Sequence, residues 1–189
     1  VKLNHPSAPP MPVILVDNNR GGDSRVYVKG NRRQRGDVAP RRFLEILSPE
    51  RREYFREGSG RKQLAETIAS EDNPLTARVI VNRVWLHQFG EGIVRSPNDF
   101  GTRCDGPSHP LLLDYLAWNF MEDGWSLKQL QKQIMLSLTW QQSSDDDPRK
   151  SEKDPSNLLF WQMNRRRLDF EALRDTILQI GGKLDLRMG

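Results

Sequence analysis

Residues 73–101 read NPLTARVIVNRVWLHQFGEGIVRSPNDFG, and they predict the element around which the rest of the chain folds. Asp72 or Asn73 can serve as N-cap, and Pro74 takes the first helical position, where its missing N–H costs nothing. The next fifteen residues contain no Gly or Pro. Apolar side chains lie almost all round this segment, a pattern typical of a buried helix. We therefore predict a buried central helix at about 74–89.

This helix also carries polar side chains, at Arg78, Asn82, Arg83 and His87. Arg78 and Asn82 are four residues apart and share one face, and Arg83 and His87 share another. A buried polar group without a hydrogen bond costs roughly 2–7 kcal/mol. We therefore expect partners for these side chains elsewhere in the chain.

A charged network is the arrangement that would satisfy them. We predict that Arg83 is largely buried and pairs with a carboxylate outside its own helix, because a buried guanidinium keeps its proton and needs a counter-charge. Arg is also suited to bidentate contacts with carboxylates. Such a network either fixes the docking of helices or lines a pocket for an anionic or sugar ligand. Its candidate members are Asn82, Arg83, His87, Asp99, His109, Arg166, Arg167, Glu171 and Asp175, with Asp99, Glu171 and Asp175 as the expected partners of Arg83.

Start signals and apolar periodicity predict further helices at about 60–70, 109–123, 126–137 and 169–180. Ser126 and Gln129 form a capping box for the third of these. For the last one we expect an inward face made of Phe170, Leu173, Ile177 and Ile180. The polar residues 139–155 are expected to be mobile.

The N-terminal part of the chain follows a different pattern. Residues 13–16 and 25–29 have strand character and could pair as a hairpin, and residues 30–40 are basic and irregular. The predicted fold class is mainly α: a compact helical domain around the central helix, with a short β or extended N-terminal arm. The predicted domains are a basic arm at 1–42 and a helical domain at 43–189, both cut from a longer chain.

Charge and cysteine content limit the classes of function. The chain contains 29 Lys and Arg against 25 Asp and Glu, and eight basic residues against two acidic ones fall between Arg20 and Arg42. A basic cluster can bind nucleic acid. No aromatic nucleic-acid motif accompanies it, so a solvated loop or a docking surface is favoured and nucleic-acid binding is a second alternative. One cysteine excludes an internal disulfide, and no apolar run reaches the roughly 18 residues of a membrane span.

The sequence favours no catalytic or metal-binding constellation. His87, Asp99, Cys104, Asp105 and His109 lack the paired spacing of zinc sites, so we expect no metal and no cofactor. The alternative to a non-catalytic module is a glycan hydrolase with a carboxylate and histidine site around Asp99, His109 and Glu171. Five tryptophans resemble a sugar-stacking set, but their context favours core packing for Trp85, Trp118 and Trp125.

Several long motifs occur in order: the stretch quoted above, PSHPLLLDYLAWNF, DGWSLKQLQKQIMLS and NRRRLDFEALRD. From about residue 40 to residue 189 these motifs resemble the planctomycete-specific domain one family, a domain of unknown function. The resemblance implies the C-terminal part of a large secreted protein, located in the periplasm or outside the cell. It also implies the parent chain's other domains as partners, including a haem domain. This chain has no CxxCH motif, so we expect any haem to belong to another domain. The family has no established catalytic residues to transfer.

The function expected from these observations is therefore a scaffold or ligand-binding module of a larger secreted multidomain protein, linked to polysaccharide use.

Overall fold

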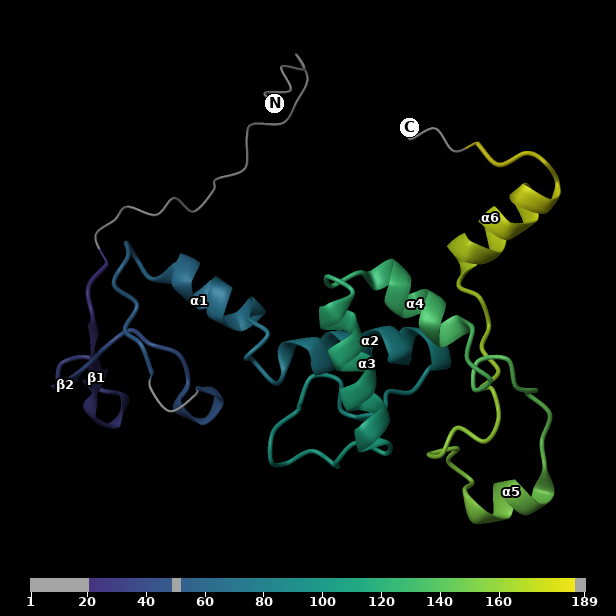
Figure 1. The fold of residues 1–189 in the computed structure, drawn as a ribbon, viewed down its shortest axis with the longest axis horizontal. Helices are drawn as coiled ribbons and strands as arrows, with labels where there is room; N and C mark the ends of the chain where they lie inside the picture. The colour runs from purple at the N-terminus through teal and green to yellow at the C-terminus, as the bar shows by residue number, and fades with distance from the viewer. Residues whose placement is uncertain (1–20, 49–51, 186–189) are drawn as a thin grey trace. The chain divides into compact units, whose positions relative to one another are not determined.

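A computed structural model describes residues 21–48 and 52–185 (Figure 1). The described residues form a mainly α fold with a small two-stranded sheet near the N-terminus, which confirms the predicted fold class. The chain divides into two compact units, one ending at Thr76 and the other beginning at Ala77. A domain boundary at 42/43 remains a prediction. None of the helices in the described ranges has the length and apolar content needed to cross a membrane.

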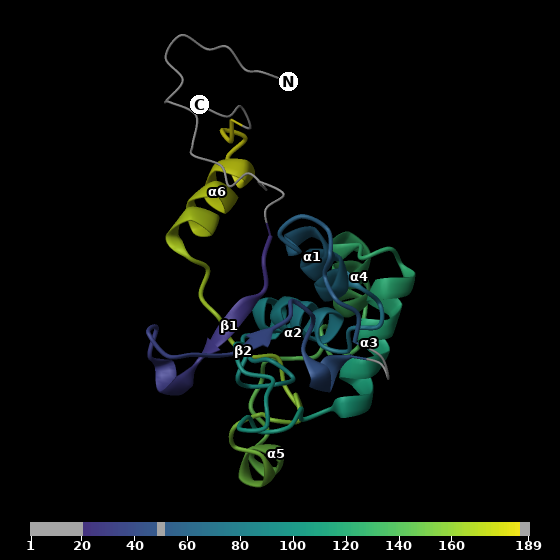
Figure 2. The same cartoon turned by 90° about the vertical axis from the view of Figure 1, so that its left-hand side faces the viewer.

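The first unit begins with an antiparallel pair of strands, β1 (Ser24–Tyr27) and β2 (Arg35–Ala39), which lie side by side in Figure 2. A short 3-10 turn at Val28–Gly30 follows β1. The prediction that 30–40 is irregular was therefore wrong in part, because its second half forms the partner strand of β1. The other expected partner, 13–16, lies outside the described residues.

Residues 40–48 and 52–60 contact one another and precede helix α1 (Arg61–Ala69). They include a 3-10 turn at Glu45–Leu47, an isolated bridge between Arg42 and Tyr54, and a hydrogen bond from the Phe55 N–H to the Arg41 carbonyl. Gly60, which precedes α1, has a φ of 81°, and a Cβ there would lie 3.0 Å from the Cβ of Phe55. Glycine therefore permits both the turn and the close approach of Phe55.

The predicted central helix is α2 (Thr76–Phe89), and it buries one face rather than all of its sides. Ala77, Val81, Trp85 and Phe89 recur at spacings of four and form the buried stripe. The indole N–H of Trp85 is buried and finds no hydrogen-bond partner among the described residues. The expectation of a helix buried all round was wrong, since the opposite face is partly or fully exposed.

Helices α3 (Pro110–Glu122) and α4 (Leu127–Met135) pack on each other and complete the main core. The predicted cap of α4 is confirmed, because the Ser126 hydroxyl accepts a hydrogen bond from the Gln129 N–H. The core of the second unit comprises Ala77, Val81, Trp85, Phe89, Ile93, Val94, Leu113, Leu116, Ala117, Phe120, Leu130, Ile134 and Phe160.

The segment expected to be mobile, 139–155, includes a short helix, α5 (Pro148–Lys153), followed by a tight turn. The buried Asp154 carboxylate accepts hydrogen bonds from the backbone N–H groups of Leu158 and Leu159. This turn presents Phe160 to the core, where its ring lies 5.3 Å from that of Trp85, centroid to centroid.

The last helix, α6 (Phe170–Ile180), lies where the sequence predicts it, and the Asp169 carboxylate caps it by accepting a hydrogen bond from the Ala172 N–H. Its expected inward face is wrong, however. Phe170, Leu173, Ile177 and Ile180 are all exposed, Ile180 to 83%.

Candidate functional site

Asn82 is the most deeply buried polar side chain of α2, with none of its surface exposed. Its amide donates to the Val94 carbonyl at 2.9 Å and accepts from the Val94 N–H at 2.8 Å. The amide thus satisfies both backbone groups of Val94. At Gly92 a Cβ would lie 2.4 Å from the Val94 oxygen and 2.9 Å from the Asn82 amide nitrogen. Asn82 therefore has a structural role: it holds the loop that follows α2.

Arg83 does not have the buried, ion-paired environment predicted for it. Its side chain is exposed, and its guanidinium donates to the amide oxygen of Asn98 at 3.1 Å. The prediction failed because only one face of α2 is buried and position 83 lies outside that face. The neighbouring cation, Arg78, does pair across helices, at 2.7 Å from the Asp114 carboxylate of α3.

Two side chains of the segment that precedes α6, Asn164 and Arg166, contact the C-terminal end of α2. Arg166 donates to the His87 carbonyl at 2.6 Å, and the amide of Asn164 donates to the Phe89 carbonyl at 3.0 Å. Both bonds satisfy carbonyls that a helix end leaves without partners. The side chain of His87 itself is exposed, as is that of Arg167.

The side chains proposed for a hydrolytic site have separate partners. The exposed Asp99 carboxylate accepts from the Gly101 N–H at 2.8 Å, in a local turn. The His109 ring is half-buried, 2.9 Å from the Ser108 hydroxyl and tilted against Phe160. Glu171 lies exposed on α6, where Asp175 pairs with its neighbour Arg174 at 3.0 Å. No hydrogen bond or ion pair within residues 21–48 and 52–185 joins Asp99, His109 and Glu171.

Metal ligation and nucleic-acid binding by the basic arm are two further chemistries to compare with the described residues. Within the described ranges no group of three or more His, Cys, Asp or Glu side chains could hold a metal ion. Residues 21–39 of the basic arm are exposed almost throughout, on the hairpin and its turn. One of its arginines, Arg41, is held by Asp23 at 3.1 Å. Nucleic-acid binding by this arm remains a prediction.

The outer face of α3 carries large exposed side chains that the sequence assigned to the core or left out. Trp118 is 57% exposed, Tyr115 55% and Leu111 83%. These residues follow one another at spacings of four and three, so they form one face, opposite the buried Leu113 and Leu116. The prediction that Trp118 packs in the core was therefore wrong. Neither aromatic ring stacks on another aromatic ring in the described part of the chain.

A polar groove runs beside this face, between α3 and α4. Its volume is about 360 Å³, and it is lined by Asn119, Asp123, Gln129, Lys132, Gln133 and Leu136. The amide of Gln133 lies 3.4 Å from the Tyr115 hydroxyl, which makes the groove continuous with the aromatic face. The side chains of Asn119, Asp123 and Gln129 have no hydrogen-bond partners among the described residues. We call the aromatic stripe and this groove together the α3 face.

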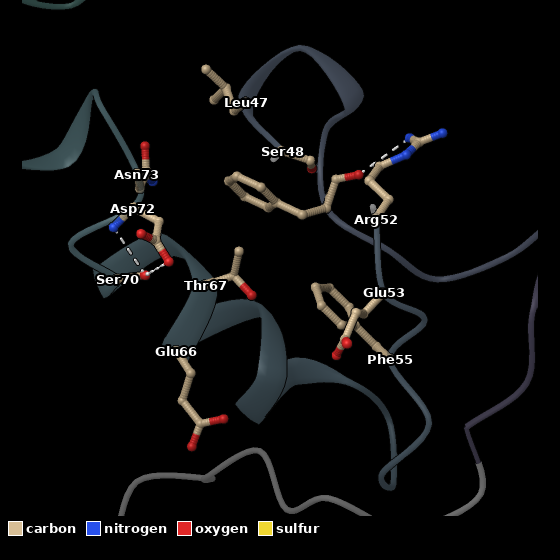
Figure 3. A pocket seen from close by; sticks show the side chains of 11 residues that line it. Leu47, Ser48, Arg52, Glu53, Phe55, Glu66, Thr67, Ser70, Asp72 and Asn73 are labelled. Carbon is tan, nitrogen blue, oxygen red and sulfur yellow. Dashed lines mark hydrogen bonds between the residues drawn. The ribbon is translucent and has the colours of Figure 1, made fainter. Parts of the chain in front are cut away.

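A second concave region lies in the first unit, between residues of 43–48 and 52–55 on one side and the stretch from Glu66 to Asn73 on the other (Figure 3). Its volume is about 350 Å³. Phenylalanine rings, carboxylates and hydroxyl groups line it together. In Figure 3 the side chains of Phe55 and Thr67 face the same space.

A signal for the α3 face is present in the sequence. Once Leu113, Leu116 and Phe120 are assigned to the core, the 3.6-residue period puts Tyr115 and Trp118 on the opposite side of the helix. The cavity in the first unit has no comparable signal, because it depends on how an irregular loop folds against α1.

Comparison with known proteins adds one match. The model of the PSD1 family, described as a protein of unknown function (DUF1553), matches residues 60–189. Since the match covers more than half of the chain, the chain belongs to this family. No curated protein and no solved structure matches the sequence.

Proposed function

We propose that this member of the PSD1 family is a non-catalytic binding module of a larger exported protein, and that it binds polysaccharide through the α3 face. The observation that carries the proposal is the pair of exposed aromatic side chains, Tyr115 and Trp118, beside a groove with unused amide and carboxylate groups.

Sugars have both apolar and polar surfaces, and so does the α3 face. One side of a pyranose ring presents C–H groups that pack on a flat aromatic surface, and Tyr and Trp provide such surfaces with a polar edge. Tyr115 and Trp118 are three residues apart on one helix, so their Cβ atoms are about 5–6 Å from each other. Two neighbouring rings can therefore contact consecutive parts of one chain.

Hydroxyl groups of a sugar also need hydrogen-bond partners. The amides of Asn119 and Gln129 each offer donors and an acceptor, and the Asp123 carboxylate offers acceptors only. Because these side chains have no partners among the described residues, they can bind hydroxyls without breaking existing bonds. A shallow, open face suits a polymer that extends beyond it. A location outside the cytoplasm is part of the proposal, because structural polysaccharides occur there.

Affinity electrophoresis of the 189-residue chain through gels containing laminarin, xylan, galactomannan or pullulan tests the proposal. We expect one of these polymers to retard the protein. Trp118→Ala and Tyr115→Ala should each weaken that retention at least about tenfold, the factor that 1.4 kcal/mol represents.

Tyr27→Ala is the matched control, because Tyr27 is also an exposed aromatic residue but lies on β1. Retention by none of the polymers, or retention that Trp118→Ala leaves intact, would contradict the proposal. A release of reducing ends that disappears in Asp99→Asn would instead favour the hydrolase alternative.

A further inference from the structure

Two arginines of the first unit share one exposed tyrosine ring. The guanidinium carbon of Arg42 lies 5.6 Å from the centroid of the Tyr54 ring, and that of Arg56 lies 6.0 Å from it. The tyrosine is 48% exposed and both arginines are exposed, so the three side chains lie together at the surface. We call them the Arg42–Tyr54–Arg56 cluster. The polysaccharide binding proposed for the α3 face does not use this cluster.

The backbone directs the three side chains to one side. Arg42 and Tyr54 are antiparallel bridge partners, and such partners point the same way, with Cβ atoms about 4.5–5.5 Å apart. Arg56 comes two residues after Tyr54, and its guanidinium reaches the same ring. A hydrogen bond from the Phe55 N–H to the Arg41 carbonyl, at 2.8 Å, holds the two segments together. Both guanidinium groups are therefore held beside one ring.

Stacking on an aromatic ring leaves the edge of a guanidinium free. A cation over a ring face gains about 0.5–1 kcal/mol at an exposed site, which limits the freedom of the arginine side chain. The N–H groups lie in the plane of the guanidinium as a fixed fork that matches the oxygens of an anion. Those of Arg42 and Arg56 bond to none of the described residues. They are therefore available to a ligand.

The carboxylates near the cluster do not neutralise it. Glu53 and Glu57 lie close in sequence, but neither makes an ion pair with an arginine of the cluster in the described part of the chain. Asp23 lines a hollow of about 380 Å³ together with two members of the cluster. Its carboxylate is already held by Arg41 at 3.1 Å. The positive charge of the cluster therefore has no counter-charge among these side chains.

This charge favours an anionic ligand. Two cations beside one ring repel each other, and an anion that contacts both offsets that repulsion. The eight basic residues against two acidic ones between Arg20 and Arg42 add a positive potential, which attracts anions over a longer distance. The volume of the hollow lies within the range of roughly 300–1,000 Å³ that small-ligand sites occupy.

We propose that the Arg42–Tyr54–Arg56 cluster binds an oxyanion group carried by a sugar. Both guanidinium groups donate to the oxygens of the anion, and the Tyr54 hydroxyl donates to a neighbouring oxygen of the sugar. Two sources offer this chemistry: the carboxylate of a uronic acid and the sulfate ester of a sulfated sugar. The choice of a sugar rests on the proposed function, whereas recognition of the anion rests on the cluster alone.

NMR titration of the ¹⁵N-labelled 189-residue chain at low salt tests the proposal. The probes are methyl glucuronide, methyl glucoside 6-sulfate, the neutral methyl glucoside and inorganic sulfate. We expect both anionic sugars to shift the Nε–Hε signals of Arg42 and Arg56, and the neutral glucoside to leave them unchanged. Added salt should weaken binding, because the cluster is exposed. Tighter binding of the glucuronide identifies a uronic acid as the ligand, and tighter binding of the sugar sulfate identifies a sulfate ester.

Arg42→Gln and Arg56→Gln should each weaken binding of the anionic sugars at least about fivefold, since hydrogen bonds between charged groups are the stronger ones. Tyr54→Leu should also weaken it, because the ring that positions both arginines is lost. Arg33→Gln is the matched control, because it removes the same charge from an exposed arginine on the turn between β1 and β2. Thermal unfolding of each variant shows whether a loss of binding is a loss of fold.

Three results would overturn the proposal. The first is the absence of shifts with both anionic sugars, and the second is an equal loss in Arg33→Gln and Arg42→Gln, which would mean that only net charge matters. The third is binding of inorganic sulfate as tight as that of the sugar sulfate, which would show that the sugar is not recognised. Trp118→Ala should leave these shifts unchanged, so a failure of polymer binding at the α3 face can be told apart from a failure here.

Discussion

The side-chain amide of Asn82 makes both hydrogen bonds that the backbone of Val94 needs. Asn82 and Val94 are buried, so without the amide neither the N–H nor the carbonyl of Val94 could bond to water instead. Leaving a buried donor or acceptor unsatisfied costs about 1–3 kcal/mol per group. Asn82 therefore fixes the position of Val94 against α2.

We expect Asn82→Leu, which preserves volume but removes both hydrogen bonds, to lower the free energy of unfolding by about 2–5 kcal/mol. Urea denaturation followed by circular dichroism measures it. Arg83→Met is the control one residue away, and because Arg83 is exposed its effect should stay within about 0.5 kcal/mol. Similar losses in the two variants would contradict the environments described for these side chains.

Asp23 is the residue whose acidity the fold changes most clearly. The pKa of its carboxyl is lowered, first by the hydrogen bond from the Arg41 backbone N–H and then by that from the Arg41 guanidinium. A pKa lowered by folding means that ionised Asp23 stabilises the folded state at pH values above the unfolded pKa of about 3.9. That contribution is lost as the pH falls through the folded pKa.

Carbon-13 NMR of the carboxyl group can follow this titration. In Arg41→Gln the pKa of Asp23 should rise, yet stay below its usual range, because the backbone N–H of residue 41 still donates. Asp23→Asn should remove this part of the acid sensitivity. A pKa of Asp23 that does not move in Arg41→Gln would show that the guanidinium has no influence on it.

The C-terminal end of α2 depends on residues from a distant segment. Arg166 donates to the His87 carbonyl and packs its side chain on Gly90, whose φ of 87° suits only glycine without strain. A cation at a helix C-terminus also interacts favourably with the helix dipole, by about 0.3–1 kcal/mol. Helix α2 thus ends where Gly90 takes a left-handed conformation and Arg166 donates to a carbonyl of the last turn.

We expect Arg166→Met to destabilise the second unit by about 1–2 kcal/mol, less than the full sum of a charge-assisted hydrogen bond and the dipole interaction, because the Arg166 side chain is exposed to water. Hydrogen exchange of the backbone amides in the last turn of α2 should speed up in this variant. Arg167→Met removes an equal charge from an exposed neighbour and should change neither quantity. An equal effect of the two variants would mean that only net charge matters.

Local signals predict the helices well because caps and periodicity act within one element. Pro110 and Gly124 bracket α3, the Ser126 cap starts α4, and Asp169 and Gly181 bracket α6. Which face becomes buried depends on partners far away in the chain. The sequence therefore misassigned Arg83, Trp118 and the apolar stripe of α6, and it missed β2, whose five residues include a glycine and few β-formers.

At the scale of the whole molecule, two concave regions fall in different units. The α3 face lies in the unit that begins at Ala77, and the acidic, phenyl-lined cavity lies in the unit that ends at Thr76. The α3 face could be predicted from helical periodicity. The cavity could not, because its lining residues come from an irregular loop and from a helix, and no local sequence pattern predicts how such a loop packs on a helix.

The family model covers one wall of the cavity and not the other. Glu66, Thr67 and Asp72 lie inside the stretch that the family model matches, whereas Phe43, Glu53 and Phe55 precede it. A relative that shares only residues 60–189 would keep the α3 face but bring one wall of the cavity without the other. A change in the length or sequence of the loop ahead of α1 would therefore alter this cavity and leave the α3 face unchanged.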